Sequence, residues 1–175
     1  TGFVLVYSRS YADVRGLWKG EFFSLVLFGV VGMMVMTASN HLLSLYVGLE
    51  LLALCLYALV ALRIDSTAAS EAAMKYFVLG ALASGILLYG MSLLYGLTGT
   101  LYINELSESI ARHDGSMLPR TMALILVLVG LLFKMGAVPF HMWVPDVYEG
   151  SPTSSTVYLA TAPKLAGFAI ILRLL

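Results

Sequence analysis

Long apolar stretches alternate with short polar ones along this chain, and the alternation predicts membrane helices. Residues 22–49 contain no charged residue, and about 20 apolar residues in a helix are enough to cross a bilayer. The polar residues 39–41 divide this stretch at a tight turn, so two helices are expected from it. The same pattern over the whole chain predicts an all-α membrane protein with five spanning helices, at residues 22–39, 42–62, 67–97, 121–149 and 152–175.

Individual residues mark where these helices begin and where they are disturbed. Ser66 or Thr67 is suited to cap the third helix, because a hydroxyl there accepts a hydrogen bond from a free N–H of the first turn. The fourth helix is expected to be interrupted around Gly136 and Pro139, since proline has no N–H and clashes with the carbonyl four residues earlier. Pro163 is expected to disturb the middle of the fifth helix in the same way.

The remaining segments are polar and are predicted to lie outside the membrane. Residues 98–120 form an extramembrane connection with a short amphipathic segment. Three basic residues in the 9–21 segment and one in the 63–70 segment favour the cytoplasmic side for both, which places 98–120 on the periplasmic side. The chain does not start with Met and stops within an apolar run, so residues 1–175 are expected to be one transmembrane domain from a longer polypeptide.

Composition agrees with a membrane protein and excludes several classes of function. Of the 175 residues, 60% are hydrophobic and only 11% are charged, whereas a soluble domain carries about 25% charged residues, so a soluble enzyme is excluded. The net charge of zero gives no basic surface for nucleic acid. The single cysteine, Cys55, permits no internal disulfide, and the three dispersed histidines do not predict a metal site.

Four charged residues fall inside predicted membrane helices. Glu50, Lys134 and Lys164 each lie ~12–20 Å from the nearer end of their helix, at ~1.5 Å per residue, and Lys75 is intermediate. A charge at the centre of a membrane helix costs roughly 2.5–3.5 kcal/mol, so the favoured interpretation is a polar pathway between helices. The alternative is an internal ion pair that only holds helices together, and for Lys75 the preceding Glu71 at i−4 supports it.

These four residues have the chemistry of a proton relay. Burial makes a lysine release its proton more readily, and a nearby carboxylate makes it hold the proton. Glu50 and Lys75 are expected to face each other within ~4–8 Å, directly or through one water, so that a movement of Glu50 would switch the lysine. Lys134 has no charged neighbour in the sequence and is expected to be unpaired.

Three further residues are candidates to support the relay. Tyr46 and Tyr57 share a helix face with Glu50, so that their phenols are placed to hydrogen-bond it or a nearby water, although tyrosines at this spacing also pack as core residues. His141 follows the expected helix interruption and is placed to extend the relay, with an interfacial packing role as the alternative.

Several segments resemble the antiporter-like membrane subunits of respiratory complex I. Residues 133–153, FKMGAVPFHMWVPDVYEGSPT, are similar to a long and specific signature of that family. VGLEL at 47–51 and AAMKYF at 72–77 resemble its glutamate-bearing and lysine-bearing helices, and APKLAGF at 162–168 looks most like one of its three large antiporter-like chains. The resemblance covers essentially the whole chain.

This resemblance implies a fold and a set of roles. The fold would be half of an inverted-repeat antiporter-like fold with one broken helix. Glu50 and Lys75 would form the family's glutamate–lysine pair, Lys134 would be the lysine at the broken helix, and Lys164 the next relay lysine. The family pumps protons in the bacterial inner membrane, driven by quinone reduction elsewhere in the complex.

The resemblance also implies partners and leaves alternatives open. NADH, FMN, iron–sulfur clusters and quinone would belong to other subunits, so this chain would carry no cofactor, and its partners would be the other membrane subunits and the lipid bilayer. A related subunit of a multisubunit cation/proton antiporter or of a membrane-bound hydrogenase is the close alternative. A structural membrane scaffold is the alternative from a different class.

Overall fold

The computed structural model describes residues 1–17, 19–112 and 117–174. The described residues form eight helices, in order α1 (Gly2–Val14), α2 (Gly20–Ala38), α3 (Leu42–Val60), α4 (Thr67–Thr98), α5 (Ile103–Arg112), α6 (Met117–Met135), α7 (Val144–Gly150) and α8 (Thr153–Leu174). Five of them, α2, α3, α4, α6 and α8, are long and apolar enough to cross a membrane. The predicted all-α membrane architecture with five spanning helices is therefore confirmed.

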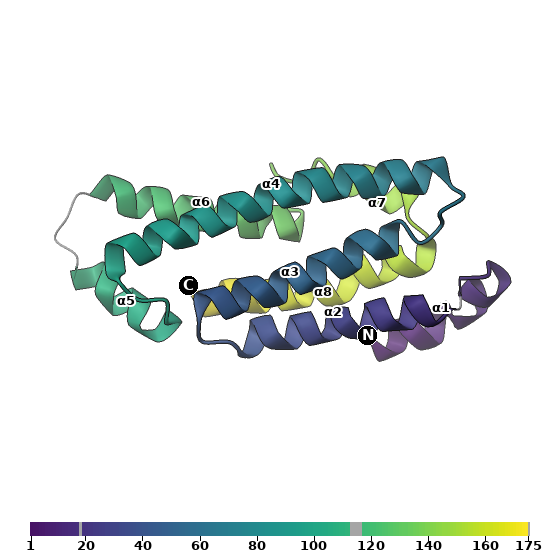
Figure 1. The fold of residues 1–175 in the computed structure, drawn as a ribbon, viewed down its shortest axis with the longest axis horizontal. Helices are drawn as coiled ribbons and strands as arrows, with labels where there is room; N and C mark the ends of the chain where they lie inside the picture. The colour runs from purple at the N-terminus through teal and green to yellow at the C-terminus, as the bar shows by residue number, and fades with distance from the viewer. Residues whose placement is uncertain (18, 113–116, 175) are drawn as a thin grey trace.

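The long helices run side by side in two groups (Figure 1). In one group α2 and α3 pack on each other and α8 lies against both, and in the other α4 packs along α6. Glycines make both pairings tight: a Cβ on Gly32 of α2 would lie 2.7 Å from the Gly48 carbonyl oxygen of α3, and one on Gly130 of α6 would lie 2.6 Å from Leu87 Cβ of α4. Such small residues let membrane helices approach closely.

Different inter-helix connections lie at the two ends of the bundle. At one end the α2–α3 turn meets the start of α5, where Leu42 N–H donates to the Leu101 carbonyl at 2.9 Å and Ile103 N–H donates to the Asn40 carbonyl at 3.0 Å. At the other end the α1–α2 and α3–α4 connections line one pocket. The amphipathic segment expected within residues 98–120 is α5, and residues 113–116 of that connection lie outside the described residues.

Helix boundaries follow the sequence closely, with one helix that was not expected. Ser66 caps α4 as predicted, its Oγ accepting from Ala69 N–H at 3.3 Å. Helix α1, in a segment for which no helix was predicted, buries Val4, Ser8 and Ala12, and it contacts α8. These residues recur every four positions, but the stripe includes a serine, and apolar residues such as Phe3 and Val6 are exposed, so the hydrophobic pattern does not mark the buried face.

Pro163 does not break α8. The helix continues through this residue from Thr153 to Leu174, so the expectation of a second helix break is wrong. Proline removes one backbone hydrogen bond, here the one to the Leu159 carbonyl. A membrane helix tolerates this loss where neighbouring helices pack around it. Leu159, whose carbonyl loses the bond, is buried in the core among such neighbours.

Candidate functional site

The interruption between α6 and α7 is the first element of the site. Helix α6 ends at Met135, and α7 begins at Val144, as predicted. Gly136 has φ +67°; its N–H donates to the Phe133 carbonyl at 2.9 Å and the N–H of Ala137 donates to the Leu132 carbonyl at 3.0 Å. This is the glycine-terminated Schellman motif. The backbone conformation of Gly136 therefore ends α6 three residues before Pro139. The clash of Pro139 with the Met135 carbonyl is not what ends the helix.

A charged cluster lies beside this interruption and joins three helices. Lys134 Nζ, in the last turn of α6, donates to Ser84 Oγ of α4 at 2.8 Å and lies 3.4 Å from Glu50 Oε1 of α3. Ser84 Oγ in turn donates to the same Glu50 oxygen at 2.5 Å. The side chains of Lys134 and Glu50 are only 15% and 26% exposed. The expectation that Lys134 is unpaired is therefore wrong.

The cluster lies near the middle of its helices. Glu50 is ~12 Å from the first residue of α3 and ~15 Å from its last, and Ser84 is more than ~20 Å from either end of α4, at ~1.5 Å per residue. Helix α6 stops at this height, so its last turn brings Lys134 to the mid-height residues of α3 and α4. Removing two opposite charges from water is costly unless they are paired and hydrogen-bonded, and Ser84 supplies the hydrogen bonds.

Lys164 lies on the other side of the α6 terminus. Its Nζ donates to the Met135 carbonyl and lies 4.9 Å from the centre of the Trp143 ring. The indole of Trp143 is itself held by its Nε1–H, which donates to the Phe133 carbonyl at 3.0 Å. The C-terminal end of a helix favours a cation, and so does the face of an indole. Lys134 and Lys164 are thus brought together at the same interrupted helix.

A small cavity separates the Lys134 cluster from α8. It has a volume of about 40 Å³, and Lys134, Met135 and Pro163 are among its lining residues. About 10–15 Å³ is enough for one water molecule where polar partners are present. The cavity lined by Lys134 is therefore large enough for water by volume, although most of its wall is apolar.

Lys75 lies apart from this cluster. Its Nζ is 2.8 Å from Glu71 Oε1 and 2.8 Å from Asp146 Oδ2 of α7, and its side chain is 45% exposed. Nine residues of α4, ~14 Å of helix, separate Lys75 from Ser84. Within the described part of the chain Glu50 pairs with Lys134 and Lys75 with these two carboxylates, so the predicted Glu50–Lys75 pair is wrong.

The two tyrosine candidates pack with the hydrophobic core, whereas His141 is exposed. The Tyr57 ring lies edge-on to Tyr76, with centroids 4.7 Å apart, and to Phe77 at 5.6 Å, and its hydroxyl fills the space beside Gly80. The hydrogen bonds of the described residues include none from Tyr46 or Tyr57 to Glu50. His141 is exposed, and its carbonyl accepts from Val144 N–H at 2.9 Å. Relay roles for these three residues remain predictions.

Sequence reasoning missed three residues of the site: Ser84, Trp143 and Asp146. Ser84 had a signal, because it is four residues after Gly80 and forms a small-residue pair with it, but its contact with Glu50 joins residues 34 apart in sequence. Trp143 and Asp146 lie in the conspicuous segment after the interruption. Among the residues that the structure describes, no group of three or more metal-ligating side chains is gathered.

Known proteins are similar to this chain in sequence and in fold. The sequence model of the family described as NADH:quinone oxidoreductase/Mrp antiporter, TM, matches residues 39–175. The chain belongs to this family. It is 60% identical over 174 residues to the NADH-quinone oxidoreductase subunit N of Thiobacillus denitrificans, covering 98% of this chain and 36% of that protein. The chain thus spans about a third of the length of such relatives.

Solved structures of this antiporter family have the same fold. A chain of respiratory complex I from Thermus thermophilus superposes with a TM-score of 0.78 at 44% sequence identity, covering 89% of this chain and 34% of that chain. A chain of the Mrp complex from Dietzia superposes with a TM-score of 0.75 at 27% identity, covering 86% of this chain and 28% of that one. The resemblance deduced from the motifs is therefore confirmed at the level of the family.

Proposed function

We propose that this chain is part of a proton-translocating subunit N of a bacterial NADH-quinone oxidoreductase. The observation that carries the proposal is the contact of Glu50, Ser84 and Lys134 beside the end of α6. Discontinuous helices at mid-membrane height are a recurrent feature of ion-transport sites. The 60% identity to a subunit N over nearly the whole chain supports this complex among those that use the family.

The proposed relay passes a proton across the end of α6. Lys134 holds the proton while Glu50 lies close, because the carboxylate stabilises the ammonium form. When Glu50 moves away, the poorly solvated ammonium gives up its proton through water in the adjoining cavity. Lys164, held at the Met135 carbonyl on the far side of the same helix end, is the next acceptor.

Lys75 enters this relay only by leaving its present partners. Its two carboxylates, Glu71 and Asp146, stabilise the protonated form, so release of its proton requires that the contact with α7 open. We keep Lys75 as a predicted fourth relay residue on this condition. Residues 9–21 and 63–70 are proposed to face the cytoplasm and 98–120 the periplasm, following the distribution of basic residues.

The coupling of pumping to quinone reduction and the partners of this chain are proposed from the NADH-quinone oxidoreductase complex, not from the residues of this chain. We infer that quinone reduction by NADH, with FMN and iron–sulfur clusters in other subunits, drives the movement of Glu50. The other membrane subunits and the lipid bilayer are the proposed partners. An Mrp-type cation/proton antiporter subunit is the second candidate, favoured by the TM-score of 0.75 to the Dietzia complex.

Substitutions of Lys134 in the full-length subunit, within the assembled complex, test the relay. Lys134→Arg keeps the positive charge near Glu50 but holds its proton at all accessible pH values. We expect this variant to assemble and to lose most proton pumping, measured in membrane vesicles and normalised to assembled complex. Quinone reductase activity falls with it if the two processes are tightly coupled. Wild-type pumping by Lys134→Arg contradicts the relay and supports the structural scaffold.

A further inference from the structure

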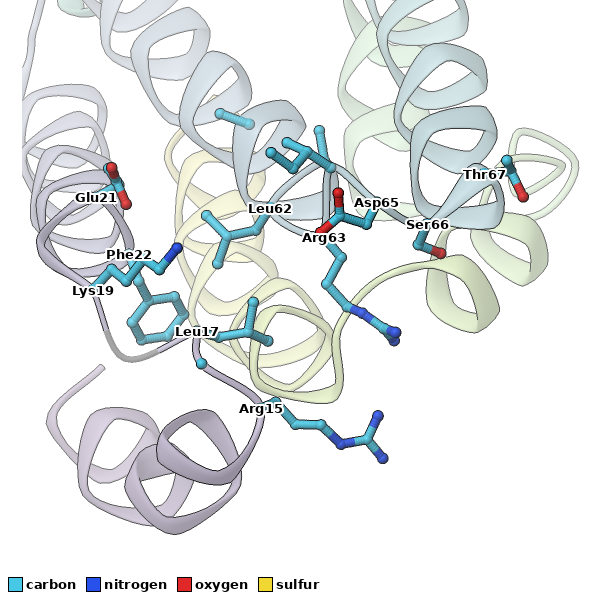
Figure 2. A pocket seen from close by; sticks show the side chains of 14 residues that line it. Arg15, Leu17, Lys19, Glu21, Phe22, Leu62, Arg63, Asp65, Ser66 and Thr67 are labelled. Carbon is cyan, nitrogen blue, oxygen red and sulfur yellow. The ribbon is translucent and has the colours of Figure 1, made fainter.

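A cavity of about 850 Å³ opens at the end of the bundle where α2 and α4 begin (Figure 2). This volume lies within the range of ordinary ligand sites, ~300–1,000 Å³. Its walls come from the α1–α2 connection on one side and from the α3–α4 connection on the other. Neither connection takes part in the Lys134 cluster, so the cavity is separate from the proposed relay.

Three cations line this cavity: Arg15, Lys19 and Arg63. All three are exposed, and none forms an ion pair with a carboxylate of the described residues. Figure 2 shows the guanidinium groups of Arg15 and Arg63 on the same side of the pocket. Two carboxylates, Glu21 and Asp65, also line it, so the lining carries one net positive charge.

The positive potential of the two arginines extends to a neighbouring phenol. The pKa of Tyr11 is lowered, chiefly by its hydrogen bond from Thr153, and Arg15 and Arg63 lower it further by their charge. Both guanidinium groups therefore lie near this phenol, which is itself outside the lining of the cavity. An anion placed between them would be attracted by both.

Apolar residues lie next to these cations. Leu17 and Phe22 form part of the lining and are 7% and 0% exposed, whereas Ile64, beside Arg63, is 84% exposed. The cavity lies where the membrane helices α2 and α3 reach the edge of the apolar layer. A ligand that suits this place has an anionic group for the cations and a hydrocarbon part for Ile64 and the lipid-facing helices.

We propose that this cavity binds the phosphate-bearing headgroup of an anionic phospholipid. Arg15 and Arg63, whose guanidinium groups lie on the same side of the pocket, contact the phosphate, and the acyl chains leave past Ile64 into the bilayer. Basic pockets between membrane helices favour anionic headgroups in this way. Free inorganic phosphate offers the same anionic chemistry, but it makes no use of the exposed isoleucine or of the position at the membrane edge.

Lipid retention by the purified complex with its full-length subunit tests this site. The complex is stripped with detergent, supplied with phosphatidylglycerol, and bound lipid is counted by native mass spectrometry. Each cation contributes a factor on the order of five to binding an anionic lipid, so Arg15→Gln/Arg63→Gln is expected to weaken phosphatidylglycerol binding about 25-fold. Arg9→Gln, on the exposed surface of α1 outside the cavity, is the matched control and should retain wild-type binding.

Two further measurements distinguish an anionic lipid headgroup from free inorganic phosphate as the ligand. Phosphatidylcholine has the same phosphate but no net charge, so wild type should retain it less well than phosphatidylglycerol, and millimolar inorganic phosphate should not displace phosphatidylglycerol. Equal phosphatidylglycerol binding by the double variant and wild type overturns the proposal, as does displacement by free phosphate. If the double variant does not assemble, Arg63→Gln alone is measured in its place with an expected loss on the order of fivefold, and unchanged binding there overturns the site.

Discussion

In the described part of the chain Lys75 and Lys134 both pair with carboxylates, and the cluster with the shorter distances, around Lys75, is the more exposed one. Lys75 lies 2.8 Å from each of two carboxylates, yet the three side chains are 45–68% exposed. Lys134 lies 3.4 Å from one carboxylate, with side chains that are 15% and 26% exposed. Solvent screens the first cluster and leaves the second in a low-dielectric setting, where the same charge matters far more. Burial, more than distance, therefore distinguishes the two clusters.

The two clusters also differ in what they connect. Lys134 and Glu50 join α6 to α3 at the height where α6 ends, with Ser84 of α4 between them. Lys75 joins α4 to α7, the short helix that follows the interruption. A change in the first cluster affects charges that cannot reach water freely, whereas a change in the second alters how α7 is held. The predictions below separate these two consequences.

The largest effect is expected from removing the lysine of the buried pair. Lys134→Met leaves Glu50 without its cation, and breaking a buried pair costs about 3–5 kcal/mol. We expect less assembled complex on native gels and a lower melting temperature of the complex. The double variant Glu50→Gln/Lys134→Met removes both charges and should recover assembly while pumping remains lost.

The double variant also provides the control for this first comparison. If Lys134→Met and the double variant assemble equally poorly, the damage comes from lost packing and not from an unpaired carboxylate. Lys75→Met at the exposed cluster is the matched single substitution and should assemble like wild type. Equal loss of assembly in the two lysine variants would remove the distinction between the clusters.

The sequence predicted the helices far better than the partners of the charges. Apolar stretches of about 20 residues determine spanning helices almost by themselves, and the interruption was located by Gly136 and its neighbours. The pairing was not predictable, since Lys134 and Glu50 are 84 residues apart and Lys75 and Asp146 are 71 apart. Spacing along one helix reveals i, i+4 neighbours such as Glu71 and Lys75, but it contains nothing about which helices pack together.

The hydroxyl between the buried charges is expected to have the next largest effect. Ser84→Ala removes one hydrogen bond to Glu50 and one from Lys134, and a bond to a charged group contributes about 1.5–3 kcal/mol. We expect a lower melting temperature and slower proton pumping in membrane vesicles. Ser92→Ala is the control, because this exposed serine on the same helix donates to the Tyr89 carbonyl and has no bond to either charged residue among the described contacts. Equal effects of both substitutions would contradict a bridging role for Ser84.

The glycine that ends α6 is expected to have an intermediate effect. Gly136→Ala places a side chain at φ +67°, which costs roughly 1–2 kcal/mol, and its Cβ would lie 2.8 Å from Val144 Cγ2 and 3.1 Å from Lys164 Nζ. We expect slower pumping in assembled complex, because Lys164 must shift away from the α6 terminus. Gly85→Ala, whose Cβ would meet no atom within 4 Å, should pump normally. Normal pumping by Gly136→Ala would show that the exact position of Lys164 does not matter.

The smallest effect is expected at the exposed cluster. Asp146→Asn removes one of the two carboxylates of Lys75 and leaves Glu71 in place at 2.8 Å. The Lys75 side chain is 45% exposed, so water solvates its ammonium group and the variant should match wild type in assembly and melting temperature. Moderate salt should likewise weaken the Lys75–Asp146 attraction in the wild-type protein by screening it. If Lys75 takes part in the relay after leaving Asp146, pumping by Asp146→Asn should be equal to or faster than wild type. A marked loss of assembly would instead show that this contact holds α7 in place, and the exposed pair would then be the structural one.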